Sequence, residues 1–193
     1  MHQDHEKTPD HLNEMIHMAQ KKTSMFTLTE RLTLDTDNTV VNATIDLGSY
    51  VDVGDRQALQ VHSVDFIFQG TTGSTALKSV YAADANCLVQ VTDLNRGGFV
   101  FADDRALVAS AVLQFGLGDN IVTSDADMYP DNYGKGSDDG RFVVNDQLYI
   151  VGLTGNLNAN QAVNVTVRVN ASIVSLTAKD FMAIAIQSTA ADN

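Results

Sequence analysis

A chain of 193 residues in which 44% are hydrophobic has the length and composition of one globular domain, and this composition argues against wholesale disorder. Its 24 acidic residues outnumber its 12 basic residues, and the formal net charge of −12 disfavours strong, direct binding of nucleic acid. Because Cys87 is the single cysteine, a disulfide framework within one chain is excluded. The sequence contains no apolar run of about 18 residues, so no transmembrane helix is predicted.

Residues 1–23 are predicted to form an N-terminal arm that is separate from the rest of the chain. Its first residues are polar and expected to be disordered, and Thr8-Pro9 is typical of the start of a short helix. With Lys7 as its only basic residue before Lys21, the arm could neutralise little nucleic acid. One face of the amphipathic helix is apolar, and we expect that face to dock on a partner. It holds Leu12, Met15, Ile16 and Ala19.

From residue 24 onward, alternation of apolar and polar side chains predicts a series of β-strands. The first two strands are separated by a short turn, so they look like a hairpin. Cys87 lies among apolar residues of a strand, which predicts a buried and inert thiol. Residues 106–115 are mostly apolar and fit either a buried strand or a short helix. The strands expected before that segment are 26–34, 41–47, 59–69 and 85–94.

Residues 119–140 form the longest segment of low hydrophobicity. Three closely spaced carboxylates there are candidates for a calcium site, although the glycine and glutamate of an EF-hand are missing. They are Asp125, Asp127 and Asp131. An exposed acidic loop is the preferred interpretation, so no cofactor is expected.

The last part of the chain contains the clearest strand. Every odd-numbered residue from Val163 to Ile173 is apolar and every even-numbered one is polar, as in a strand with one face in a core. Another strand is expected at 141–151. Thr177 followed by Asp180 resembles a capping box that begins a helix, although a closing strand over 181–186 fits equally well. About eight strands with few helices predict an all-β, eight-stranded jelly-roll β-sandwich over residues 24–193.

No catalytic motif accompanies these strands, so the protein is not expected to be an enzyme. The nucleophile motif Gly-x-Ser-x-Gly is absent. Asp103 and Asp104 are adjacent, and adjacent side chains point apart in a strand or turn, which disfavours paired-carboxylate catalysis. His62 is the only histidine after residue 23, which largely excludes a cupin-like metal centre and favours a structural role for this side chain.

The order of a short arm, an eight-stranded body and long loops resembles that of viral single jelly-roll capsid proteins. The opening strands carry the resemblance: Phe26-Thr-Leu-Thr-Glu-Arg-Leu-Thr-Leu, Val41-Asn-Ala-Thr-Ile-Asp-Leu and Val61-His-Ser-Val-Asp-Phe-Ile-Phe. It implies a structural protein of the virion, with many copies in an icosahedral shell joined through sheet edges, loops and arms. The arm would bind a neighbouring copy, a second capsid protein or an internal membrane. The alternative is a secreted or surface β-sandwich binding module, with calcium in its acidic loops.

Overall fold

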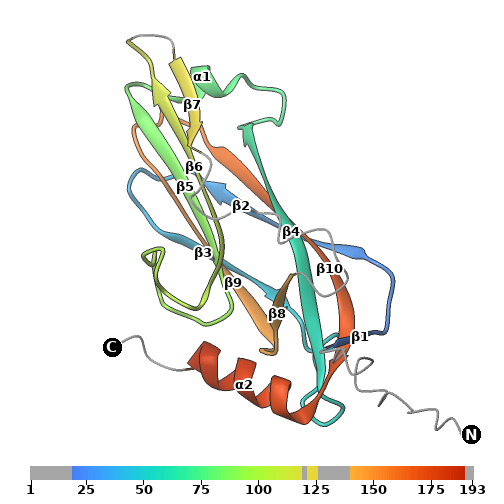
Figure 1. Cartoon of the computed structure of the whole chain (residues 1–193). Coiled ribbons are helices and arrows are strands. Elements are labelled where there is room, and N and C mark those ends of the chain that lie inside the picture. Colours follow the sequence, from blue (N-terminus) through green and yellow to red (C-terminus); the bar gives the residue numbers. More distant parts are fainter. Residues whose placement is uncertain (1–18, 119–120, 126–139, 190–193) are drawn as a thin grey trace, which may run out of the picture.

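The computed structural model describes residues 19–118, 121–125 and 140–189, and their strands form two five-stranded antiparallel sheets that face each other (Figure 1). Sheet A contains β1 (Ala19–Lys21), β2 (Phe26–Leu34), β4 (Gln57–Gly70), β8 (Arg141–Val143) and β10 (Val163–Leu176). Sheet B contains β3 (Val41–Asp46), β5 (Ala85–Thr92), β6 (Leu107–Gly116), β7 (Ile121–Asp125) and β9 (Gln147–Thr154). The helices of the described residues are α1 (Leu77–Val80) and α2 (Ala178–Thr189).

The strand order is that of a jelly roll. In sheet A the order is β2-β10-β4-β8, and β1 continues the line of β2 along β10. In sheet B the order is β3-β9-β5-β6, with β7 added beside β6. The chain crosses to the other sheet after β2, β3, β4, β7, β8 and β9, whereas β5, β6 and β7 pair in succession within sheet B. This arrangement of crossovers is that of two Greek keys. The predicted all-β jelly-roll sandwich is confirmed, and β1 and β7 are present in addition to the eight strands expected.

Two of the predicted strand arrangements are wrong. The first two strands do not form a hairpin, because β2 pairs with β10 and β3 pairs with β9 in the other sheet. Residues 141–151 are not one strand, because the chain leaves sheet A after β8 and enters sheet B as β9. Alternation identifies a strand but does not name its partner, and here the partner lies far along the chain: Glu30 of β2 is opposite Val167 of β10.

A third correction concerns the predicted N-terminal arm. Ala19 was expected on the apolar face of a helix, but it belongs to β1, where it pairs with Leu176. Residues 19–21 are thus part of sheet A, and the arm as predicted over 1–23 extends into the sandwich. The other residues of the expected apolar stripe, Leu12, Met15 and Ile16, lie outside the described residues.

The structure decides both segments that the sequence left open. Residues 107–116 form the buried strand β6 rather than a helix. After β10 the chain forms helix α2 rather than a closing strand. The Thr177 hydroxyl accepts a hydrogen bond from the backbone N–H of Asp180 at 3.2 Å and donates one to its carboxylate at 2.5 Å, so Thr177 caps the helix as the capping-box pattern predicts.

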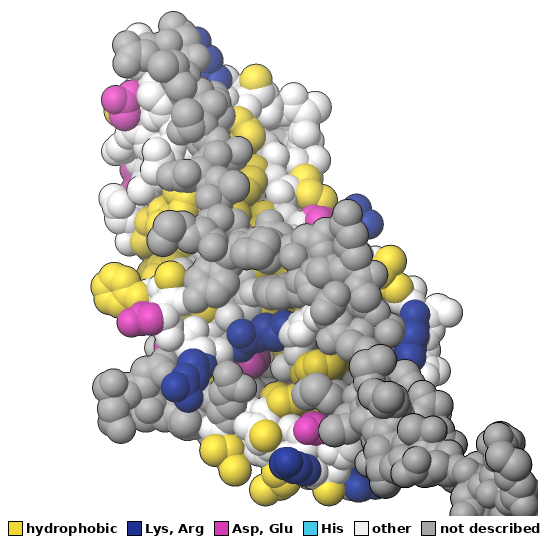
Figure 2. All heavy atoms as spheres, in the orientation of Figure 1, with side chains coloured by type: hydrophobic (Ala, Val, Ile, Leu, Met, Phe, Trp, Pro, Cys, Tyr) yellow, Lys and Arg dark blue, Asp and Glu magenta, His cyan; other side chains and the backbone are white. Residues whose placement is uncertain are grey.

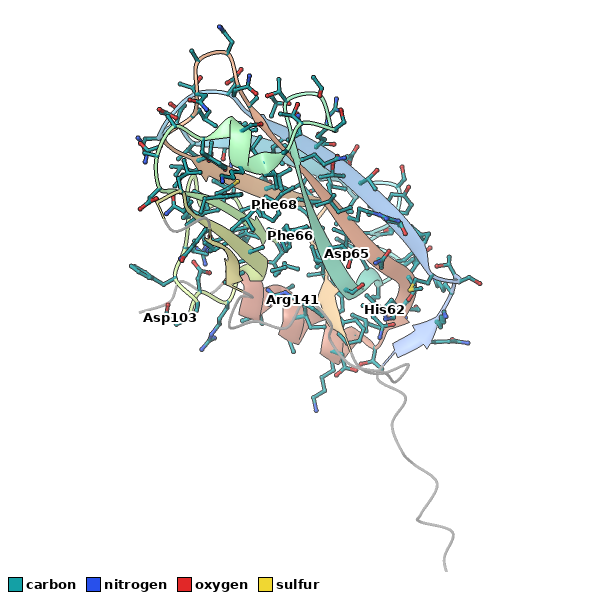
Figure 3. The ribbon with its side chains drawn as sticks, turned by 90° about the horizontal axis from the view of Figure 1, so that it is seen from above. His62, Asp65, Phe66, Phe68, Asp103 and Arg141 are labelled. Carbon is teal, nitrogen blue, oxygen red and sulfur yellow. The ribbon has the colours of Figure 1, made fainter. Side chains whose placement is uncertain are left out.

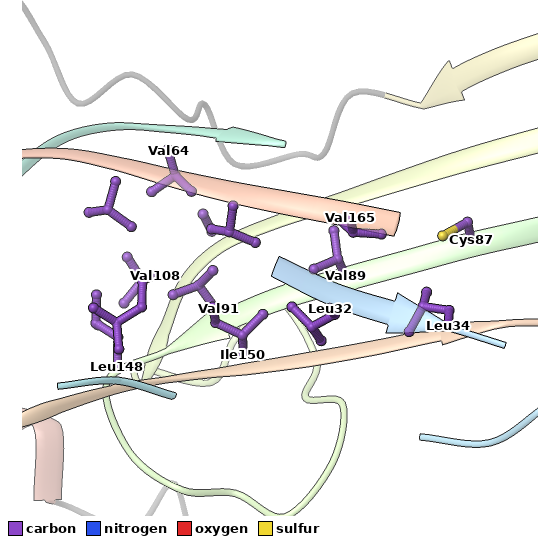
Figure 4. Close-up of a cluster of buried hydrophobic side chains, with 14 of the residues drawn as sticks. Leu32, Leu34, Val64, Cys87, Val89, Val91, Val108, Leu148, Ile150 and Val165 are labelled. Carbon is purple, nitrogen blue, oxygen red and sulfur yellow. The ribbon is translucent and has the colours of Figure 1, made fainter. Parts of the chain in front are cut away.

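Aliphatic side chains from the inner faces of both sheets form the main core (Figure 4). β10 supplies a row of fully buried side chains, from Val163 to Ala171 at every second residue. Opposite them lie Leu148 and Ile150 of β9. Cys87 is fully buried in the same core, and burial raises the pKa of its thiol to about 12, which agrees with the predicted inert thiol.

A second, smaller cluster joins α2 to the end of sheet A. Phe181 of the helix packs with Ala58 of β4 and with Val174 and Leu176 of β10. These strand residues alternate with residues of the main core such as Leu59, so they belong to the opposite face of the sheet. Helix α2 therefore covers the outer face of sheet A at one end of the sandwich.

Truncation of one core side chain should test this packing. Leu148 is fully buried between the sheets, so Leu148→Ala should lower the free energy of unfolding by about 2–5 kcal/mol through lost burial and the cavity left behind. Val53→Ala is the control, because Val53 is exposed and should change stability by less than about 0.5 kcal/mol. Urea unfolding followed by circular dichroism measures both, and similar losses for the two variants would contradict the assigned core.

Candidate assembly surfaces

The β5–β6 loop, residues 93–106, is held against the outer face of sheet B. Gln90 alternates with the buried Val89 and Val91, so its side chain points away from the core. Its amide donates to the Val100 carbonyl and accepts from the Val100 N–H, both at 2.9 Å. Further along the loop, the Arg96 guanidinium is 3.0 Å from the Asp104 carboxylate. These contacts give the loop a defined conformation.

This conformation places a large aromatic side chain in water. Phe101 follows Val100 directly and is 86% exposed. The Asp104 N–H donates to the Phe101 carbonyl at 3.1 Å, so the backbone turns immediately after the aromatic residue. An exposed phenylalanine on a well-fixed loop loses little conformational entropy when it is buried by a partner. The loop therefore has the character of a pre-formed contact site.

At the start of the same loop, a buried ion pair joins the two sheets. Asp93 is 2% exposed, and its Oδ2 lies 3.0 Å from Nη2 of Arg141, the first residue of β8. Arg141 also donates a hydrogen bond to the Arg105 carbonyl, and the Asn145 amide donates to the Asp93 carbonyl at 2.7 Å. Asp93 follows β5 of sheet B whereas Arg141 belongs to sheet A, so the pair fixes the loop base to both sheets (Figure 3 labels Arg141).

The electrostatics of this pair are unbalanced. Burial raises the pKa of the Asp93 carboxyl, and the nearby Arg141 charge opposes that shift without cancelling it. Oδ1 of Asp93 and Nε of Arg141 are buried, and neither finds a hydrogen-bond partner within the described residues. The ion pair thus gives the loop a fixed position at a cost in desolvation.

A second apolar surface lies on α2, at one end of the sandwich. We call Met182, Ala183 and Ile186 the α2 surface; they lie on the helix face opposite the buried Phe181 and point to solvent. Met182 is 58% exposed and Ile186 is 61% exposed. Figure 2 shows hydrophobic side chains gathered at the lower end of the molecule, the end at which Figure 1 places α2.

The residues predicted as calcium ligands are not brought together by the described part of the chain. Asp125 is the last residue of β7, where it pairs with Val112 of β6. Asp127 and Asp131 lie outside the described residues. Over residues 19–118, 121–125 and 140–189, no group of three or more His, Cys, Asp or Glu side chains is placed to hold a metal ion.

His62 has the surroundings of a structural histidine. It occupies the irregularity where β4 shifts register against β10, and its Nε2 lies 2.8 Å from the Ser172 hydroxyl. Burial, and to a lesser degree the charge of Lys21, lowers the pKa of its imidazole. Ser172 is fully buried and also donates to the Gln60 side chain at 3.4 Å, so these groups satisfy one another.

The hollows on the described surface are polar and shallow. One of about 530 Å³ lies at the end of the sandwich that contains Asn38, Asp84 and Asn156. Another of about 290 Å³ lies between the β5–β6 loop and strands β3 and β9. Neither joins an apolar lining to converging charged groups, which is the arrangement typical of a small-molecule site.

No protein-family model and no curated protein matches this sequence. Among solved structures, the chain is similar to apo chimpanzee polyomavirus VP1, with a TM-score of 0.39 and 8% identity, over 82% of this chain and 100% of that one. A chain of turnip yellow mosaic virus gives a TM-score of 0.31 and 10% identity, over 80% and 96% of the two chains. Desmodium yellow mottle tymovirus gives 0.30 and 8%, over 82% and 92%. These structures come from viruses.

The ion pair at the loop base predicts an unusual pH dependence. The pKa of Asp93 is higher in the folded chain than in the unfolded one, so protonation of Asp93 stabilises the fold. This contribution to the free energy of unfolding is fully present below the unfolded pKa of about 3.9. It is lost as the pH rises through the folded pKa. The stability of the wild type relative to Asp93→Asn should therefore fall between about pH 4 and pH 7. Urea unfolding at both pH values measures this difference. A wild-type advantage that grows with pH would contradict the prediction.

Proposed function

We propose that this protein is a structural capsid subunit, many copies of which assemble into the shell of a virion. One observation carries the proposal: among the exposed large apolar side chains are the most exposed one, Phe101, and a pair on one helix face, each on a well-defined framework. Phe101 stands on the hydrogen-bonded β5–β6 loop, and Met182 and Ile186 stand on the capped helix α2. Apolar side chains grouped on a surface mark sites where proteins bind one another.

The position of these two surfaces favours an assembly larger than a dimer. The β5–β6 loop lies on the outer face of sheet B, whereas α2 covers the end of sheet A (Figure 1). A subunit with two different contact surfaces can bind two different neighbours, and repeated heterologous contacts of this kind generate closed rings and shells. A rigid sandwich with a fully packed core suits such a role, because it transmits the geometry of one contact to the next.

The charge and the polar faces are compatible with this role. The net charge of −12 repels phosphate, so we do not assign direct nucleic-acid binding to the sandwich. The partners in the proposal are copies of the same chain, with a second capsid protein or an internal membrane as partners of the N-terminal segment. None of the helices in the described chain has the length and apolarity needed to cross a membrane. We expect no enzymatic activity and no cofactor.

Replacement of the exposed aromatic residue tests the proposal. Phe101→Ser should leave the melting temperature unchanged, because the side chain makes little contact with its own subunit. It should weaken the subunit contact by about 2 kcal/mol, or roughly 30-fold in dissociation constant, if Phe101 is a contact hot spot. Sedimentation velocity and negative-stain microscopy of purified protein measure the assembly, with Val53→Ser as the control at another exposed site.

Two outcomes would overturn the proposal. If Phe101→Ser assembles at the same protein concentration as the wild type, the β5–β6 loop is not part of the subunit contact. A wild-type protein that remains a single small species at all concentrations, and whose melting temperature rises with calcium, would instead favour the secreted or surface binding module.

The N-terminal segment gives a separate prediction. Removal of residues 1–18 leaves β1 and its pairing with β10 intact, so the sandwich should fold with an unchanged melting temperature. If Leu12, Met15 and Ile16 dock on a neighbouring subunit or on another layer, the shortened protein should form fewer or smaller particles than the full chain. Electron microscopy of the two proteins at equal concentration measures the difference. Equal particle yield would show that the segment has no part in assembly.

A further inference from the structure

Sheet B ends in a strand that carries no protection against further pairing. β3 pairs with β9 on one side, and no other described strand pairs with its other side. The edge strand β2 of sheet A differs, because the charged Glu30 occupies a half-buried position on its core-facing side. An inward-pointing charge is a device that opposes strand addition at an edge. β3 has only Val41, Ala43 and Ile45 on its core-facing side.

The backbone of β3 directs three residues toward the free edge. The N–H of Leu47 donates to the Asp146 carbonyl at 2.7 Å, just beyond the last pair of the β3–β9 ladder. Hydrogen-bonding positions alternate along an antiparallel pair, so Ile45, Ala43 and Val41 also bond toward β9. The peptide groups of Asn42, Thr44 and Asp46 therefore face the free edge.

We propose that β3 pairs antiparallel with β3 of a second copy of this chain, about a two-fold axis at Ala43, so that sheet B continues from one subunit into the next. This inference rests on the proposed function and names one contact of the shell. In this register Asn42 of each copy lies opposite Thr44 of the other, and the two exchange backbone hydrogen bonds. On the core-facing side, Val41 lies opposite Ile45 of the neighbouring copy, which continues the apolar face.

The same fold already uses the side-chain pair that this register creates. In sheet A, Thr27 Oγ1 donates to the Asn170 side chain at 2.7 Å across the β2–β10 pair. Thr33 Oγ1 donates to the Asn164 side chain at 2.8 Å in the same way. Asn42 and Thr44 are exposed on β3 and provide the same two groups for a neighbour. Cross-strand pairs of this kind stabilise antiparallel sheets.

The remaining residues of β3 fit the two-fold arrangement. Ala43 meets its own copy at a non-hydrogen-bonded position, where the two Cα atoms approach to about 4.5 Å and a small side chain is needed. Asp46 falls opposite Val40 rather than opposite another carboxylate. The groove of about 290 Å³ beside Asn42 and Thr44 leaves room for side chains of the neighbour on the outer face.

A disulfide at the axis tests this pairing. In the full-length protein, Ala43→Cys places two thiols across the proposed axis at a Cα separation within the range of about 4.4–6.8 Å that a disulfide requires. Mild oxidation should convert most of this variant to a covalent dimer on non-reducing electrophoresis. Val41→Cys is the matched control, since Val41 would face Ile45 and not its own copy, and Cys87 is buried in both variants. The proposal is overturned if Ala43→Cys forms no covalent dimer, or if Val41→Cys forms an equal amount of covalent dimer.

Two variants with altered charges test the register of the proposed β3–β3 pairing independently. Asn42→Asp with Thr44→Lys places opposite charges across both pairs of the seam, whereas Asn42→Lys with Thr44→Lys places like charges there. The second variant should associate roughly tenfold more weakly than the first in sedimentation equilibrium, while both melt at similar temperatures. Equal association of the two variants overturns the register.

These results separate the two proposals. If particles form but Ala43→Cys does not cross-link, the β3 contact is disproved and the capsid role stands. A cross-linked dimer in a protein that never forms particles would retain the β3 contact and remove the capsid role.

Discussion

The pairing of β10 with its neighbours is the interaction on which the rest of this structure depends. This strand of 14 residues lies between β4 on one side and β1 and β2 on the other. It therefore joins the beginning of the described chain to its end through hydrogen bonds that span most of the sequence. Its inner face supplies the fully buried valines of the core, and its outer face supplies the asparagines of the cross-strand pairs. Long-range pairing of this kind makes the sandwich cooperative and slow to form.

A consequence of this architecture is that contacts to other molecules must come from edges, loops and the appended helix. The core is buried between the sheets, and polar side chains on the outer face of sheet A bond to one another, such as Asn170 with Thr27, Ser63 and Asp65. Phe101 on the β5–β6 loop and Met182 and Ile186 on α2 are among the exposed large apolar side chains. The packed strands and the exposed loop and helix are thus different parts of the chain, as the proposed role of a shell subunit requires.

The Asp93–Arg141 pair connects these two parts. It lies where sheet A, sheet B and the base of the β5–β6 loop meet. Among the described residues Asp93 is the buried charged one, whereas the Arg141 side chain is 26% exposed. Replacing such a pair by apolar groups is often neutral for stability, so its value lies in fixing a geometry. Here the geometry that it fixes is the position of the loop that presents Phe101.

The sequence by itself determined most of the strands, because a period of two in side-chain polarity shows which face of each strand is buried. The run from Val163 to Ile173 and the cap at Thr177 could be located within one or two residues for this reason. The sequence did not predict β1, β7 or the break between β8 and β9. Only the tertiary structure decided which strands pair, since β2 would show the same alternation whether it paired with β3, the next strand in the sequence, or with β10. It also decided that Phe101 is exposed, because its surroundings depend on the Gln90–Val100 hydrogen bonds, which no local pattern specifies.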